Sequence, residues 1–363
     1  MVEKKNQHYV PQFYFRFFSN NGKDICIFNI DNKNHFVGPF KNQSSRDYFY
    51  VKGKELEDAF EKIEQSQRES INKLIESKSF KALSKEEYIE ILRFITFQDT
   101  RTNYAKRGAN EATQYLVREC VKPKMLQDEE LTKKITKEEI NSLDLTFPAD
   151  HLISIDVGLQ SPILISDLIP ILLINNTGRE FLFSDHPIIL YNLFFHRDTF
   201  ESHIGFQSPG LLIFCPLSKD LCLLLFDSKT YKIESSKANV LEIDSPMEIE
   251  KINKLQLHRC DRNIYYSNSN QKEKLDKLFE EFSKNNVKNK EITKFRKLKV
   301  LNKPNSEILM IGERNINENI ELSFLRVNEI TERLGKIRNQ ELVDVFNSFF
   351  KKKFSVFKHS SSS

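Results

Sequence analysis

Residues 211–227, LLIFCPLSKDLCLLLFD, contain two short runs of Leu, Ile and Phe separated by the turn-like segment SKD. Short apolar runs bounded by polar turn residues are typical of buried strands. Two similar runs precede them, ILISDLIPILLINN at 163–176 and REFLFSD at 179–185, and the segments NNTG and HP separate the runs. The second half of the chain is therefore predicted to form a buried, mostly antiparallel sheet.

Two long helices are expected before this sheet. Residues 54–78 place Leu56, Phe60, Ile63 and Leu74 near helical spacing, with mostly polar residues between them. Ser84 and Glu87 form a capping box in front of an apolar run, so a second helix is expected to begin near Lys85 and to continue past Arg101 toward Cys120. The two helices are predicted to form a hairpin.

The predicted fold class is α+β, with the N-terminal helix hairpin packed on the mostly antiparallel sheet and a C-terminal α/β extension. Strands at 24–30 and near 47–50 are expected to join the sheet from the beginning of the chain, and 122–141 to form a short surface helix or a connection. Two domains are predicted, a core at 1–270 and a basic extension at 271–363. The extension is expected to contain strands within 297–312 and 320–327 and a helix at 341–350.

Composition excludes several classes of protein. The longest apolar stretch, 162–174, is interrupted by Asp167 and Pro170 and is shorter than the roughly 20 residues of a membrane helix. The five cysteines are odd in number and form no CxxC pair, which argues against a disulfide framework and favours a reducing cytoplasm. The phosphate-binding, nucleophile-elbow and HExxH motifs are absent.

Positive charge is concentrated at the C-terminal end. From Gln271 onward there are 20 Lys and Arg against 13 Asp and Glu, a net +7, which leaves −3 for the first 270 residues. Such asymmetry indicates a surface that meets an acidic partner, and nucleic acid is the partner we expect for the extension. A solvated Lys-rich tail is the simpler alternative. The oligomeric state is left open.

Polar residues in apolar surroundings are the candidate site residues. NQHYVPQFYFRFF, 6–18, combines His8 with six aromatic rings, and FLFSDHP places Asp185 at the end of an apolar strand. The opening segment is also consistent with an extended anchor, and Asp185 with an Asx turn that binds backbone N–H groups.

The first predicted helix carries a charged stripe. Its members are spaced by four, three and four residues along one helical face: Glu57, Glu61, Glu64 and Arg68. A solvated face is the usual meaning of such a stripe. Arg101 and Gln98, three residues apart on the second helix, are candidates to face it.

Five motifs, in this order, resemble a widespread bacterial and phage-associated family known only as a domain of unknown function (DUF4238), with HYVPQF as its signature. They are HYVPQFYFRFF, LEDAFEKIE, FITFQDTRT, FLFSDHPIIL and FCPLSKDLCLLLF, and they span roughly residues 6–268. The resemblance implies that the following residues occupy the family's characteristic positions: His8, Pro11, Glu57, Glu64, Arg101, Ser184, Asp185 and Ser218. His186 stands where many relatives have Asn. The resemblance brings no established reaction.

One His, several carboxylates and an Arg are the parts of a site that hydrolyses a phosphodiester. We therefore expect a hydrolase, first of all a metal-dependent nuclease, acting as a toxin or a phage-defence effector. The expected catalytic residues are His8, Glu57, Glu64, Arg101 and Asp185. Glu57, Glu64 and Asp185 would hold Mg²⁺ or Mn²⁺, while Tyr9, Gln98, Ser184 and Ser218 would contact the substrate. The alternative is a non-catalytic binding module in which the same residues form a buried structural network.

Overall fold

The structure, a computed structural model, describes residues 6–50, 55–143, 150–198, 201–234, 237–285, 291–300, 303–329 and 335–360. Within these ranges, no helix combines the length and the apolar character that crossing a membrane would require.

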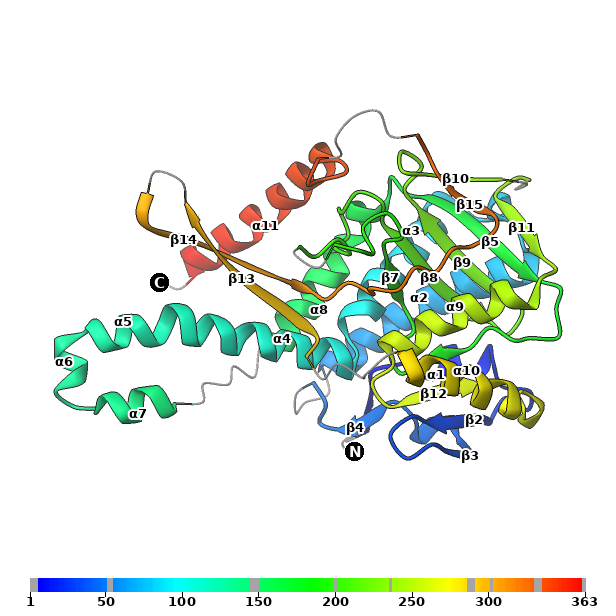
Figure 1. Cartoon of the computed structure of the whole chain (residues 1–363), viewed down its shortest axis with the longest axis horizontal. Helices are drawn as coiled ribbons and strands as arrows, with labels where there is room; N and C mark the ends of the chain where they lie inside the picture. Colours follow the sequence, from blue (N-terminus) through cyan, green and yellow to red (C-terminus); the bar gives the residue numbers. More distant parts are fainter. Residues whose placement is uncertain are drawn as a thin grey trace.

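The largest sheet has five strands in the order β11-β5-β9-β8-β7 (Figure 1). Their bounds are β5 (Ile169–Asn175), β7 (Ile189–Tyr191), β8 (Leu212–Ser218), β9 (Leu221–Phe226) and β11 (Val240–Ile243). Neighbouring strands are antiparallel except β11 and β5, which are parallel. The stretch 211–227 forms the β8–β9 pair, and every residue of β9 is buried. This confirms the α+β class with a buried, mostly antiparallel sheet.

The opening strands do not join the five-stranded sheet as expected; a second sheet joins the beginning of the chain to its second half. Its order is β3-β2-β12-β6, and all pairs are antiparallel. The bounds are β2 (Asp24–Asn29), β3 (Asn34–Pro39), β6 (Phe183–Ser184) and β12 (Asn263–Tyr266). Three two-stranded pairs complete the strands: β1 (Asn6–His8) with β4 (Ser45–Asp47), β10 (Tyr231–Ile233) with β15 (Leu325–Val327), and β13 (Thr293–Val300) with β14 (Lys303–Glu313).

The expected helix hairpin is present and covers one face of the five-stranded sheet. It consists of α2 (Glu55–Ser77) and α3 (Lys85–Thr100), which pack against each other. Leu74 and Ile95 of these helices share an apolar core with Leu172 and Leu223 of the sheet. The Ser84 capping box forms as predicted.

The second helix was expected to continue past Arg101 toward Cys120, but it ends at Thr100. Arg101 is the C-cap of α3, and the Thr102 hydroxyl accepts a bond from Ala105 N at 3.2 Å to begin a new helix, α4 (Asn103–Leu116). A side-chain acceptor at an N-cap replaces the missing intrahelical partner. The chain therefore changes direction immediately after the candidate arginine.

The other face of the five-stranded sheet is covered by later parts of the chain. Helix α9 (Pro246–Arg259) packs there together with residues 316–325, and α10 (Lys272–Asn285) packs on the four-stranded sheet. Residues beyond 270 thus contribute to two apolar cores. The expected strand at 320–327 is limited to β15, and the expected boundary at residue 270 stays a prediction.

The opening aromatic stretch is an anchor, although only part of it is extended. β1 is followed by the short helix α1 (Gln12–Arg16), in which Phe13, Tyr14 and Phe15 are buried. The expected strand near 47–50 lies slightly earlier, because β4 ends at Asp47 and Tyr48 takes a positive φ of 53°.

One part of the molecule projects from this body (Figure 1). It contains α4, the hairpin β13–β14, and α11 (Gln340–Ser360). Three short helices form the region expected at 122–141: α5 (Lys122–Gln127), α6 (Glu129–Thr132) and α7 (Lys137–Ser142). The strands expected within 297–312 are β13 and β14, with 301–302 outside the described residues.

The remaining elements are α8 (Asp150–Gln160), the π-helical η3 (Val117–Val121) and the 3-10 segments η1 (Phe40–Asn42), η2 (Phe80–Ala82), η4 (Ser161–Ile165) and η5 (Ser269–Gln271).

Candidate functional site

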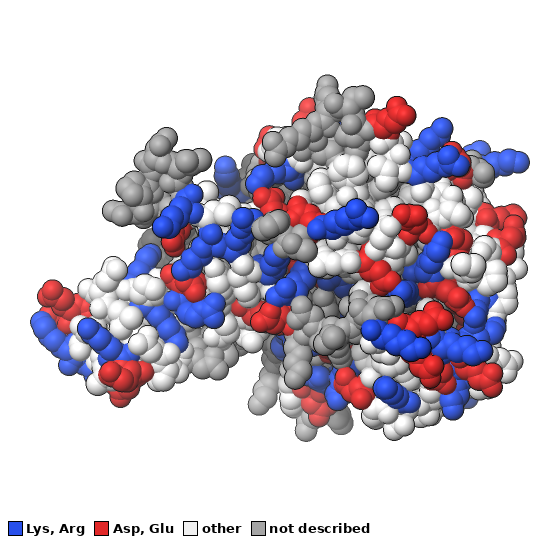
Figure 2. Space-filling model, viewed as in Figure 1, with Lys and Arg blue, Asp and Glu red and all other residues white. Residues whose placement is uncertain are grey.

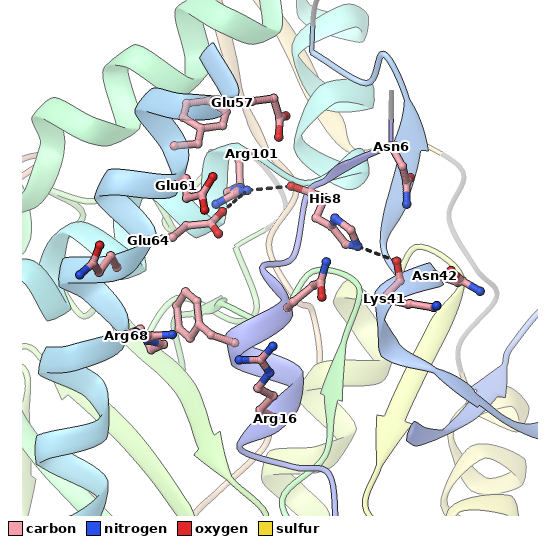
Figure 3. Close-up of a pocket in the computed structure, with 14 residues that line it drawn as sticks. Asn6, His8, Arg16, Lys41, Asn42, Glu57, Glu61, Glu64, Arg68 and Arg101 are labelled. Carbon is pink, nitrogen blue, oxygen red and sulfur yellow. Dashed lines mark hydrogen bonds and ion pairs between the residues drawn. The ribbon is translucent and has the colours of Figure 1, made fainter. Parts of the chain in front are cut away.

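A polar cleft of about 750 Å³ lies between the N-terminal segment and α2 (Figure 3). Its lining comes from α2 on one side and from β1, α1 and η1 on the other, with Arg101 at the end of α3 between them. Basic, acidic and amide side chains dominate the lining: Asn6, His8, Gln12, Arg16, Lys41, Asn42, Glu57, Glu61, Glu64, Gln65, Arg68 and Arg101, with Phe13 and Phe60. Five elements between Asn6 and Arg101 therefore form one solvent-reachable site.

The carboxylates of the cleft come from the charged stripe of α2. Glu57, Glu61 and Glu64 fall on one face because four-, three- and seven-residue separations nearly complete whole helical turns. The apolar positions of the helix, such as Leu74, pack into the core and fix its rotation. The stripe, which also carries Arg68, therefore faces the cleft.

Arg101 is the buried member of the site. It is 1% exposed, and its guanidinium donates to the His8 carbonyl oxygen at 2.7 Å and to the Tyr50 hydroxyl at 3.1 Å. The same guanidinium forms a 2.8 Å ion pair with Glu64 and lies 4.6 Å from the centre of the Phe97 ring.

These contacts determine the charge of Arg101. Burial lowers the pKa of Arg101, but Tyr50 and Glu64 outweigh this effect and raise it above its ordinary value. Burial also raises the pKa of Tyr50 to about 12. The site therefore contains a permanently charged guanidinium that ties α2 and α3 to the N-terminal segment.

His8 is held through both its backbone carbonyl group and its ring. Its carbonyl oxygen accepts the Arg101 bond, and its Nε2 lies 2.9 Å from the carbonyl oxygen of Lys41 (Figure 3). A carbonyl oxygen only accepts, so Nε2 is the donor in this contact. In the neutral imidazole the basic nitrogen is then Nδ1.

Asp185 and Ser184 do not reach this cleft. Asp185 is 1% exposed, and its carboxylate accepts backbone N–H bonds from Asp261 at 2.8 Å, Arg262 at 2.8 Å and Asn263 at 3.1 Å. Burial, aided by the Asp261 carboxylate, raises the pKa of Asp185 to about 7 against the opposing effect of the three donors. Ser184 donates to the His186 carbonyl oxygen at 2.8 Å. The Ser184 hydroxyl also accepts from His186 N at 3.2 Å, as in the turn alternative, whereas the N–H donors of Asp185 lie 76–78 residues along the chain and form no Asx turn.

The expected metal ligands are accordingly not assembled as a set. Glu57 and Glu64 line the cleft, whereas both Asp185 oxygens bind the backbone elsewhere. Among the described residues, no three His, Cys, Asp or Glu side chains are grouped so that they could hold a metal ion.

The other residues expected to contact the substrate make hydrogen bonds within the fold. Gln98 Nε2 donates to the Tyr9 carbonyl oxygen at 2.9 Å, and both residues are buried. Ser218 Oγ accepts from Asp220 N at 3.2 Å in the β8–β9 turn. The ring of His186 stacks on the ring of Tyr104, and its Nδ1 lies 2.7 Å from the Thr102 hydroxyl. Burial lowers the pKa of His186 to about 3.

The sequence interpretation missed two cations of the cleft, Arg16 and Lys41. The sequence does indicate Arg16, because Arg16 is the lone charged residue in the aromatic opening segment. No local sequence pattern indicates that Lys41 belongs to a site, because only the tertiary structure brings η1 to the cleft.

No significant match to this chain exists among the curated proteins or among the solved structures. A family model described as a protein of unknown function (DUF4238) matches residues 6–270, and the chain therefore belongs to this family.

Proposed function

We propose that this protein is a hydrolase that cleaves a phosphodiester bond of nucleic acid in the cleft beside α2. The observation that carries the proposal is the meeting of His8 with three glutamates and four cations in one solvent-reachable cleft: Glu57, Glu61 and Glu64 with Arg16, Lys41, Arg68 and Arg101. Hydrolysis of a phosphodiester needs a proton acceptor, positive charge on the phosphate and an oriented water.

We assign a role in this reaction to each residue from its contacts. His8 is the proposed general base, because its Nε2–H is directed to the Lys41 carbonyl oxygen and its Nδ1 remains the basic atom. Arg16 and Arg68 are proposed to bind the phosphate oxygens. Arg101 is a positioning residue, since it holds Glu64 and the backbone of His8.

The acidic stripe suits a divalent cation that is held by two carboxylates together with the substrate. Mg²⁺ is commonly bound by one or two carboxylates together with substrate phosphates rather than by a full set of protein ligands. Glu57 and Glu61, four residues apart on one face of α2, are the proposed pair. When bound with the substrate, the ion would neutralise phosphate charge. Asp185 is not part of this pair.

Nucleic acid as the partner is supported by the projecting part of the molecule. Strand β13 carries Lys294, Arg296, Lys297 and Lys299. Figure 2 shows Lys and Arg side chains on this part, interspersed with Asp and Glu. Basic residues along an extended element suit contacts with phosphates.

The setting we propose for this activity is a phage-defence effector in the cytoplasm. All five cysteines are free thiols, which fits a reducing compartment.

Cleavage assays on purified variants test the proposal. Labelled single- and double-stranded DNA, RNA and tRNA are incubated with Mg²⁺, with Mn²⁺ and with chelator. We expect His8→Ala and Glu57→Gln to lower cleavage by about a hundredfold or more with little change in melting temperature. Glu69→Gln is the matched control, because Glu69 lies on α2 outside the cleft lining. Absence of cleavage by the wild-type chain, or full activity of both cleft variants, would contradict the proposal.

The second candidate is a non-catalytic binding module. It is favoured by one observation: Asp185, Ser184 and Gln98 all direct their side-chain hydrogen bonds to the fold itself. This candidate predicts no cleavage by the wild-type chain and large melting shifts when these residues are replaced.

A further inference from the structure

A second cavity, of about 890 Å³, is lined by residues of α4 and of the later part of the chain. Its walls are α4, the C-terminal end of α9, α10, and the two segments 291–294 and 314–317 at the base of the β13–β14 hairpin. The cavity therefore forms where residues matched by the family model meet residues beyond 270.

One side of this cavity is cationic and built from buried contacts. Arg259 is 3% exposed, and its guanidinium donates to the Tyr104 hydroxyl at 2.7 Å, to the Arg314 carbonyl oxygen at 2.8 Å and to Glu313. The Arg314 guanidinium forms an ion pair with Glu291. Both arginines line the cavity, and the Nε atom of each is buried without a hydrogen-bond partner among the described residues.

Lys294 adds a third cation to this side. It lines the cavity, and within the described part of the chain no hydrogen bond or ion pair holds its ammonium group. Burial and the nearby Arg314 and Arg296 lower the pKa of Lys294, while Asp198 opposes the shift. Glu313 and Glu291 already pair with Arg259 and Arg314, so Lys294 is the cation that an anion placed here would neutralise.

The carboxylates of the cavity also have contacts of their own. Asp198 accepts a bond from His203 Nε2 at 2.7 Å, and Glu291 is paired with Arg314. Asp31 lies 3.5 Å from the guanidinium of Arg262. Each of these carboxylates thus has a cationic or histidine partner of its own.

The other side is apolar and aromatic. Phe279 and Phe282 of α10 contribute rings, Ile292 and Ile316 contribute aliphatic surface, and Tyr104 lies beside the cations. Binding pockets for small ligands typically combine such a surface with a few polar groups and enclose about 300–1,000 Å³. A lining that combines aromatic rings with cations suits a ligand that carries both a ring and a phosphate.

We propose that this cavity binds a nucleotide, with its phosphates against Lys294, Arg259 and Arg314 and its base against Phe279 and Phe282. The proposal is independent of hydrolysis in the cleft beside α2, because it concerns different residues and requires only binding. It assigns a role to the extension, since Lys294 and Arg314 lie outside the family match.

Calorimetric titration of the full chain tests the proposal with three probes, ADP, adenosine and inorganic phosphate. We expect ADP to bind, and adenosine and phosphate each to bind at least about tenfold more weakly, because each supplies only one of the two contacts. Lys294→Gln is expected to weaken ADP binding about tenfold. Lys277→Gln, an exposed position of α10 outside the cavity lining, is the matched control and should leave the affinity within about twofold.

Several outcomes would overturn the proposal. They are no heat with ADP at millimolar concentration, equal losses in Lys294→Gln and Lys277→Gln, and adenosine or phosphate binding as tightly as ADP. A loss of ADP binding in Arg68→Gln but not in Lys294→Gln would place the nucleotide in the cleft beside α2 instead. Phe279→Leu supplies a second check, because it should weaken ADP binding and leave phosphate binding unchanged.

Discussion

Arg101 and Glu64 form an ion pair of 2.8 Å in which the arginine side chain is 2% exposed and the glutamate side chain is 24% exposed. The pair joins the end of α3 to the cleft-facing stripe of α2. Because the same guanidinium also binds the His8 carbonyl oxygen, one residue sets the positions of the proposed base and of the acidic stripe.

Replacing Arg101 with Met should therefore destabilise the protein strongly. The change removes the ion pair and two further hydrogen bonds from a buried position, and breaking a buried pair lowers the free energy of unfolding by about 3 kcal/mol or more. Urea unfolding followed by circular dichroism measures the loss. Arg68→Gln is the control, because Arg68 lines the cleft at the surface and should change the free energy by less than about 0.5 kcal/mol. Equal stability of the two variants would contradict the structural role of Arg101.

Asp185→Ala should destabilise the protein without a specific loss of activity. The carboxylate satisfies three backbone N–H groups at residues 261–263, and leaving such groups buried and unpaired lowers the free energy of unfolding by about 3 kcal/mol in total. Ser218→Ala is the comparison, since it removes a single bond at the β8–β9 turn. Thermal melting beside the cleavage assay separates the two effects. A variant that melts like the wild type but has lost activity would return Asp185 to the catalytic residues.

Local pattern was enough to predict the main elements. The run 211–227 forms β8 and β9, and the Ser84 capping box placed the beginning of α3 at Lys85. These signals are local, because strand burial and helix capping depend on residues a few positions apart.

The site was harder to predict because it depends on contacts distant in sequence. Helical spacing put the glutamates of α2 on one face and left open whether that face was solvated or met Arg101; the ion pair of Glu64 with Arg101 shows that they meet. Asp185 did not join them: a carboxylate after a strand has the same local pattern whether it binds a substrate or distant backbone N–H groups. Nothing local brings Lys41 to His8.

Acid should destabilise the protein through His151. Burial first, then Lys106, lowers the pKa of His151 to about 3, although the bond from Nε2 to the Thr100 carbonyl oxygen opposes this shift. The unfolded chain has the ordinary pKa of about 6.5, so between about pH 6.5 and 3 it binds more protons than the folded protein. Stability is therefore complete above about pH 6.5 and is lost as the pH falls.

The expected loss attributable to His151 is about 2 kcal/mol between neutral pH and about pH 5. Urea unfolding at both pH values measures it. His151→Asn should have a lower stability at neutral pH and a smaller pH dependence. Part of the pH dependence of stability should remain in this variant, because the pKa of His186 is also lowered to about 3. An unchanged slope would show that His151 is not held neutral by the fold.

Deleting residues 271–363 tests whether residue 270 is a domain boundary, and we expect the remainder to fail to fold. The deletion removes α10 and β15, and with them the buried residues Ile316, Ile320, Leu322 and Leu325 of the core on the second face of the five-stranded sheet. Burial of one large aliphatic side chain contributes about 1.5–3 kcal/mol, so these four alone approach the stability of a typical domain.

The same deletion also breaks buried hydrogen bonds. Tyr191, which is 1% exposed, donates to the Glu318 carbonyl oxygen at 2.8 Å and accepts from Ile320 N at 3.0 Å, and the shortened chain has neither partner. A chain that ends at Asn339 is the matched control, because it removes α11 and the residues after it and keeps the ion pair of Arg338 with Asp167 at 2.8 Å. We expect residues 1–339 to be soluble and to melt cooperatively and residues 1–270 to aggregate, as measured by size-exclusion chromatography and circular dichroism. If residues 1–270 instead elute as a folded species, the core of the second face closes without the extension, and the boundary at 270 is correct.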